Sequence, residues 1–109
     1  MDHIKILDLI EFSADKRVRK KLIGSDKIAA ELLCYEPGQS TPVHQHPTQD
    51  EIFFVISGRG TIEVGDEAVS FAANSLLRVP AGTPHGLTAS ERSVLFFVKA
   101  PAVVSNPGR

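Results

Sequence analysis

The chain has 109 residues, enough for one domain with a modest core and too few for two. Its net charge is −1 at pH 7, so no overall field attracts nucleic acid or an acidic membrane, and we expect neither as a partner. The single cysteine excludes an internal disulfide and favours a reducing compartment. Because the sequence has neither a long apolar run nor a basic, apolar leader, we expect a cytoplasmic protein.

The first quarter of the chain contains an apolar segment and a basic one. Residues 4–12 carry six apolar residues without a clean period, which indicates either a strand or a short turn of helix. Residues 16–23 alternate and predict a strand with Arg17, Arg19 and Lys21 on one face. This basic face is either a patch for an anion or nucleic acid, or the solvated side of an edge strand.

A second strand is predicted at residues 27–36, after a turn at 24–26. Both of its faces are largely apolar, so the pattern leaves open which one points inward. Cys34 is therefore either a small buried hydrophobe or a thiol near the functional site. Tyr35, the only tyrosine, is either a packing residue or a phenol at that site.

Two histidines and a carboxylate follow with a spacing that suits a metal ion. On a strand, His44 and His46 project from the same face because they are two positions apart. Glu51 would face the other way on an unbroken strand, but the turn-forming residues 47–50 reset the alternation. Two imidazoles and a carboxylate form a ligand set for a divalent transition metal.

The strand predicted at 51–57 is apolar on both faces, which indicates that both are covered. If Glu51 points inward, Phe53, Val55 and Ser57 do so too and form an apolar pocket floor. The cover for the other face is a second sheet, a terminal segment or a second subunit. We therefore expect a homodimer that buries either the N-terminal strand or the apolar surface around Ile52, Phe54 and Ile56.

The second half of the chain alternates short strands with turns. Strands are predicted at 61–64, 68–71, 76–79 and 93–99. We expect a loop at 86–92 and a loose tail at 101–109. Many short strands at turn spacings, without an amphipathic helix, predict an all-β sandwich or barrel.

A third histidine ends a turn rich in proline and glycine. Pro80 and Gly82 shape a tight turn that leads to His85, which we expect to be the fourth metal ligand. Arg78 lies just before this turn. It is either a clamp for a substrate carboxylate or an exposed cation on a strand.

Residues 38–58 resemble motif one of the cupin superfamily. They read Gly, five residues, His-x-His, four residues, Glu, six residues and Gly, and match that motif at every fixed position. Residues 74–89 resemble motif two, in which Pro80, Gly82 and His85 match. The short segment between the motifs is similar to that of compact single-domain prokaryotic cupins.

Two positions of motif two depart from the family pattern. Asn74 replaces a glycine, which is a mild change because asparagine tolerates the left-handed conformation of a turn glycine. Ala89 replaces an asparagine and removes any hydrogen bond that the family makes with that side chain. Neither departure removes a metal ligand.

The resemblance implies a double-stranded β-helix, the jelly-roll cupin barrel, as a single domain over residues 1–109. It also implies one divalent transition metal per chain (Fe, Mn, Ni, Zn, Co or Cu) in the barrel mouth, or a barrel that keeps these residues without metal. The metal ligands are His44, His46, Glu51 and His85. Small cupins commonly pair, which also favours a homodimer.

Two functions are compatible with such a site. One is a mononuclear-metal enzyme of dioxygenase or isomerase/lyase type that acts on a small oxygen-donor metabolite, because four protein ligands leave two positions of an octahedral ion open. The other is a non-catalytic module that binds or senses a sugar or small anion. The fold alone does not choose between them.

Overall fold

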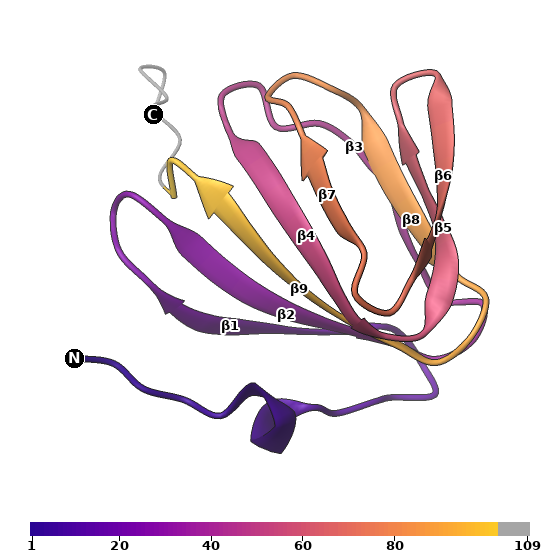
Figure 1. The fold of residues 1–109 in the computed structure, drawn as a ribbon, viewed down its shortest axis with the longest axis horizontal. Helices are drawn as coiled ribbons and strands as arrows, with labels where there is room; N and C mark the ends of the chain where they lie inside the picture. Colours follow the sequence, from indigo (N-terminus) through magenta and orange to yellow (C-terminus); the bar gives the residue numbers. More distant parts are fainter. Residues whose placement is uncertain (103–109) are drawn as a thin grey trace.

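The structure is a computed structural model that describes residues 1–102 of the chain. In these residues the strands form two antiparallel sheets that face each other (Figure 1). The larger sheet has the order β1 (Val18–Gly24), β2 (Ala29–Tyr35), β9 (Ser93–Ala100), β4 (Asp50–Ser57) and β7 (Leu76–Val79). The smaller sheet has the order β3 (Ser40–His44), β8 (His85–Ala89), β5 (Arg59–Val64) and β6 (Glu67–Ala72). The predicted all-β, double-stranded β-helix fold is confirmed.

The main core fills the space between the two sheets. Inward-facing residues of both sheets pack together there, as expected when strand side chains alternate between faces. On β4, Phe53 and Val55 follow Glu51 into the interior, as predicted. Ser57 is exposed instead, because the pairing of β4 with β9 shifts register between Val55 and Ser57. On β2, Leu33 and Tyr35 face this core.

The N-terminal segment covers part of the outer face of the larger sheet. It includes the 3₁₀ helix η1 (Ile6–Leu9), so the short-helix alternative for residues 4–12 is correct (Figure 1). Ile6, Leu9, Ile10 and Phe12 pack on a second cluster that contains Leu32, Cys34 and Val94. Cys34 therefore behaves as a small buried hydrophobe, on the face of β2 that points away from the main core.

The prediction of a loop at residues 86–92 is wrong for its first half. Residues His85–Ala89 form β8, which lies between β3 and β5 and pairs with both. Gly86 in this strand marks a close approach of backbones, since a Cβ there would lie 3.0 Å from a Val43 methyl group and 3.1 Å from the Thr41 carbonyl oxygen. The strand conformation of these five residues is therefore set by pairing with β3 and β5, and not by their own sequence pattern.

Two features of the turns bear on the site and on the end of the described chain. Asn74 has φ 70°, the left-handed conformation expected for the residue that replaces the family glycine.

Gln49 is buried and its side-chain amide donates to the carbonyl oxygens of Pro101 (2.7 Å) and Ala102 (3.3 Å). Of the tail predicted to be loose at 101–109, residues 103–109 lie outside the described part. No helix within residues 1–102 is long and apolar enough to cross a membrane.

Candidate metal centre

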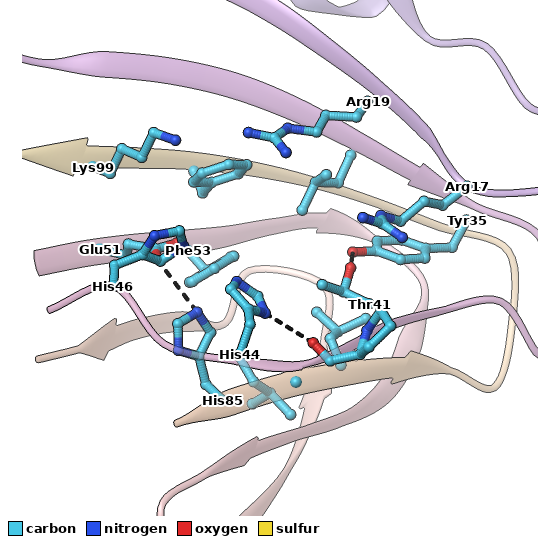
Figure 2. A pocket seen from close by; sticks show the side chains of 16 residues that line it. Arg17, Arg19, Tyr35, Thr41, His44, His46, Glu51, Phe53, His85 and Lys99 are labelled. Carbon is cyan, nitrogen blue, oxygen red and sulfur yellow. Dashed lines mark hydrogen bonds and ion pairs between the residues drawn. The ribbon is translucent and has the colours of Figure 1, made fainter. Parts of the chain in front are cut away.

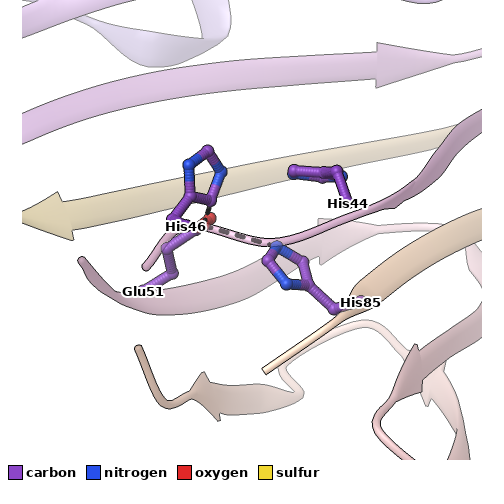
Figure 3. A group of neighbouring side chains, drawn as sticks. All are labelled: His44, His46, Glu51 and His85. Carbon is purple, nitrogen blue, oxygen red and sulfur yellow. Dashed lines mark ion pairs between the residues drawn. The ribbon is translucent and has the colours of Figure 1, made fainter. Parts of the chain in front are cut away.

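The four predicted ligands come together at one end of the space between the sheets (Figure 3). His44 ends β3 and is the register partner of His85, which begins β8. His46 follows in the loop, and Glu51 is the second residue of β4. The donor atoms of these residues all lie within 4.8 Å of one another. We call His44, His46, Glu51 and His85 the His/Glu cluster.

Two backbone N–H groups of the second motif turn donate hydrogen bonds to the loop and strand start of the first motif. The Gly82 N–H donates to the carbonyl oxygen of His46 at 2.8 Å. The Ala81 N–H donates to Oδ1 of Asp50, also at 2.8 Å. Gly82 has φ 77°, which glycine adopts without strain. The turn that precedes His85 is thus attached to the loop that carries His46.

Carbonyl oxygens orient two of the imidazole rings. Nδ1 of His44 lies 2.8 Å from the carbonyl oxygen of Pro42, and Nδ1 of His85 lies 2.9 Å from that of Thr83. A carbonyl only accepts, so each Nδ1 carries the hydrogen. In the neutral rings, Nε2 of His44 and His85 then has a free lone pair, which is the state that a metal ion requires.

Two buried atoms of the cluster lack hydrogen-bond partners among the described residues, namely Oε1 of Glu51 and Nε2 of His85. They lie 3.3 Å apart, and Oε1 of Glu51 is also 3.1 Å from Nε2 of His46. A carboxylate that faces a neutral ring nitrogen at this distance is repulsive unless a cation lies between them. Donors at right angles around one ion, with bonds of about 2.1 Å, are about 3 Å apart. The cluster therefore fits a metal ion.

The charge states of the histidines follow from the same contacts. Burial lowers the pKa of His46, and the attraction of Glu51 offsets this only in part. Burial also acts to lower the pKa of His85, but the Glu51 carboxylate and the Thr83 carbonyl outweigh it, so the net pKa is raised. A proton on His85 is thus the cation that competes with a metal ion for this position.

The cluster opens into a cavity of about 330 Å³ (Figure 2). Its floor is apolar and includes the rings of Phe53 and Phe97, stacked with centroids 5.2 Å apart. Tyr35 also lines the cavity, and its hydroxyl lies 2.7 Å from Oγ1 of Thr41. Burial raises the pKa of Tyr35, so the phenol stays protonated at neutral pH. Tyr35 thus both packs in the core and faces the cavity.

Three cations line the same cavity: Arg17, Arg19 and Lys99, which we call the basic wall. Nη2 of Arg19 lies 3.0 Å from Oε2 of Glu31, and Nε of Arg19 binds Oε1 of the same carboxylate. Nζ of Lys99 lies 3.4 Å from Oε2 of Glu31. Burial opposes ionisation of Glu31, but Arg19 and Lys99 outweigh it, and the pKa of Glu31 is lowered.

The position of the basic wall bears on both interpretations of residues 16–23, an anion patch and the solvated side of an edge strand. β1 is an edge strand, yet Arg19 on this strand and Arg17 just before it line the cavity. The alternation at 16–23 predicts that Arg17 and Arg19 share a face. Only the pairing of β1 with β2 shows that this face points into the cavity. Arg78 is exposed, pairs in register with Ile52 and lies outside the cavity lining, which does not support a clamp at that position.

Comparison with known proteins shows the family. Residues 31–99, more than half of the chain, match the family model of the cupin domain, so the chain belongs to the cupin family. Auxin-binding protein 4 of Zea mays is 27% identical over 93 residues, 73% of this chain and 45% of that protein. An uncharacterised protein of Streptomyces coelicolor is 51% identical over 54 residues, 50% of each chain. The chain spans about half the length of these curated relatives.

Solved structures share the fold of this chain. The TT1209 protein of Thermus thermophilus has a TM-score of 0.87 and 26% identity to this chain. The match covers 93% of this chain and 98% of that one. An RmlC-like cupin of Desulfovibrio desulfuricans has a TM-score of 0.84 at 24% identity, which supports the fold.

Ala89, which replaces the family asparagine, is fully buried in the main core.

Proposed function

We propose that this protein is a mononuclear-metal cupin enzyme of dioxygenase or isomerase/lyase type that acts on a small oxygen-donor metabolite. The His/Glu cluster would hold one divalent transition metal ion (Fe, Mn, Ni, Zn, Co or Cu). The observation that carries the proposal is the pair of buried, unpartnered atoms of Glu51 and His85, 3.3 Å apart at the end of a cavity, within the described residues. These two atoms need a cation, and the His/Glu cluster that contains them lines a cavity with room for a small molecule.

A bound metal ion would supply Lewis-acid or redox chemistry toward an oxygen-donor ligand. Residues of the chain orient the metal ligands, exclude water and attract the bound molecule. The carbonyl oxygens of Pro42 and Thr83 hold two rings in the ligating tautomer. Phe53 and Phe97 exclude water from the reacting end of the ligand. The basic wall attracts and orients an anionic ligand.

Metal analysis tests the site directly. The purified protein should contain one transition metal ion per chain, and the double variant His44→Ala/His46→Ala should lose it while keeping its far-ultraviolet circular dichroism. His3→Ala serves as the control, because His3 lies outside the His/Glu cluster. Full metal content in the double variant would refute the assignment.

Turnover requires a separate measurement. Protein loaded anaerobically with Fe(II) should bind a diketone, hydroxy acid or catechol and, on admission of air, consume dioxygen faster than free Fe(II) does. Glu51→Ala should slow this consumption, because it removes the carboxylate ligand.

A binding or sensing module for a small anion or sugar is the second candidate. Two observations favour it. The hydroxyl of Tyr35 contacts Thr41 and the amine of Lys99 contacts Glu31, so neither group is free to act as a general acid or base. A maize relative is named as an auxin-binding protein. Recovery of every tested ligand unchanged after aerobic incubation with Fe, Mn, Ni and Cu would establish this function and exclude the oxidative enzyme.

We also propose that residues 1–109 act as a single cupin domain and that the protein is a homodimer. Ile52 is 47% exposed and Leu76 is 68% exposed on the outer side of β4 and β7, beside the part of the sheet that the N-terminal segment covers. Light scattering at micromolar concentration should give about twice the chain mass of 11.8 kDa. The monomer mass would contradict the dimer. The single buried thiol of Cys34 suits the cytoplasm.

A further inference from the structure

We propose that Arg17 and Arg19 form an oxyanion subsite of the cavity and that the ligand is a small dicarboxylate, with one carboxylate at the His/Glu cluster and the other at this arginine pair. This inference rests on the proposed metal site for the first carboxylate. The second carboxylate would lie at a different part of the chain, since Arg17 immediately precedes β1 and Arg19 is its second residue (Figure 2).

The first argument is the unused hydrogen-bonding capacity of the two guanidinium groups. Nε of Arg17 is buried and has no partner in the part of the chain that the structure describes. Its Nη1 makes one long contact, 3.3 Å, to the carbonyl oxygen of Ser40. A buried N–H donor of a cation without an acceptor is costly, and a ligand oxyanion would satisfy it.

Arg19 supplies the second guanidinium in a fixed orientation. Glu31 binds its Nε and Nη2, which leaves Nη1 without a partner among residues 1–102. The side chain of Glu31 is only 3% exposed, whereas that of Arg19 is 49% exposed. The buried carboxylate therefore holds the guanidinium in place without covering it. An ordered, partly free guanidinium suits two-point recognition of a carboxylate.

The second argument is the charge of the cavity. Arg17, Arg19 and Lys99 outnumber the two carboxylates of Glu31 and Glu51, so the charge is positive before a metal ion is added. A divalent ion increases this excess. A ligand with one negative charge would leave much of it uncompensated, whereas a dianion would neutralise both ends of the cavity.

The third argument is the distance between the His/Glu cluster and the arginine pair, together with the apolar surface between them. β1 and β4 are separated by β2 and β9, which is three inter-strand steps or about 14 Å across the sheet at about 4.8 Å per step. The register also places Arg19 level with Val55, four residues along β4 from Glu51, or about 13 Å at about 3.3 Å per residue. The long arginine side chains bridge part of this distance. The lining in between is apolar, with Leu33, Phe53 and Phe97. A short carbon chain between two carboxylates matches this sequence of polar, apolar and polar surface.

Calorimetry with the zinc-loaded protein tests the subsite. The probes are succinate, glutarate and adipate, each paired with the monocarboxylate of equal chain length. We expect at least one dicarboxylate to bind about tenfold or more tightly than its partner, the effect of one charge-assisted arginine contact. Arg17→Gln should weaken binding of the dicarboxylate much more than binding of the monocarboxylate, and so remove this preference, while the zinc content stays unchanged because Arg17 lies outside the His/Glu cluster. Arg78→Gln, which lies outside the cavity lining, should change neither.

A second variant covers the case in which Arg17→Gln does not fold. The double change Arg19→Gln/Glu31→Gln replaces an ion pair by a neutral pair and should also lower the dicarboxylate preference. No preference in the wild-type protein, or a preference that survives both changes, would overturn the subsite. Tighter binding of 3-phosphonopropionate than of every dicarboxylate would overturn the carboxylate assignment.

The same data separate the two proposals. If the protein holds no zinc and monocarboxylates do not bind, but a dicarboxylate binds in a manner that depends on Arg17, the subsite stands and the metal function fails. If monocarboxylates bind to the zinc protein with no gain from a second carboxylate, the metal function stands and the subsite fails.

Discussion

Arg19 on β1 and Glu31 on β2 form a two-point ion pair across the antiparallel ladder, in which Arg19 is directly opposite Leu33 and Glu31 is opposite Lys21. The contact is diagonal, and it joins a half-exposed cation to a buried carboxylate. Lys99 approaches the same carboxylate from β9. Glu31 thus joins the edge strand β1 to the centre of the larger sheet.

This relationship predicts how stability depends on pH. The pKa of Glu31 is lowered in the folded protein, so its contribution is present above the ordinary glutamate pKa of about 4.3 and is lost as the pH falls through the folded value. Glu31→Gln should lower the free energy of unfolding at pH 7 by about 1–3 kcal/mol. It should also flatten the decline in stability below about pH 4.3, where the unfolded chain takes up the Glu31 proton before the folded protein does. Urea titrations at several pH values measure both effects.

The matched control is Glu63→Gln on β5, where the side chain is exposed. It should leave both the stability at pH 7 and its pH dependence unchanged. An acid profile for Glu31→Gln identical to that of the wild type would show that the ion pair contributes nothing.

Metal binding should stabilise the folded chain. At a free zinc concentration of about 100 times Kd, the free energy of unfolding should rise by about 2.7 kcal/mol, because the ligands converge only in the folded state. His85→Ala should abolish this response, and addition of EDTA should reverse it in the wild type. Thermal unfolding with and without zinc checks the prediction, which fails if His85→Ala responds as the wild type does.

Gly60 should not tolerate a side chain. A Cβ at this position would lie 2.5 Å from Cζ of Phe71 and closer still to the Thr88 carbonyl oxygen, in the middle of the smaller sheet. Gly60→Ala should therefore destabilise the protein by about 3 kcal/mol or more, which exceeds the loss expected for Gly38→Ala. Gly38→Ala is the comparison: it has φ 86° but no atom within 4 Å, so only the backbone conformation costs free energy, about 1–2 kcal/mol. Equal losses of stability would contradict the packing argument.

Tyr35→Phe should lower the stability of the protein without changing its metal content. It removes the hydroxyl that contacts Thr41 and should cost about 1 kcal/mol of stability, while the ring stays in the core. Metal content should not change, because Tyr35 is outside the His/Glu cluster. A double-mutant cycle with Thr41→Val measures the contact itself, and strictly additive effects would mean that the hydroxyls do not interact.

The features that depend on local geometry were predictable from the order of the residues alone. His44 and His46 share a face because they are two positions apart on an extended chain, and the turn at 47–50 allows Glu51 to join them. The turn before His85 and the left-handed Asn74 follow from residue chemistry in the same way. The fold class followed from the number of short strands and from the family motifs.

The face of each strand that meets a given partner depends on contacts in the folded protein. β8 was missed because its five residues are specified by β3 and β5, on either side, and not by their own pattern. The inward direction of Leu33 and Tyr35, the covered position of Cys34 and the role of Arg17 and Arg19 as a cavity wall all depend on sheet pairing. Alternation divides a strand into two faces, but burial selects between them, and burial is set by contacts between residues distant in the chain.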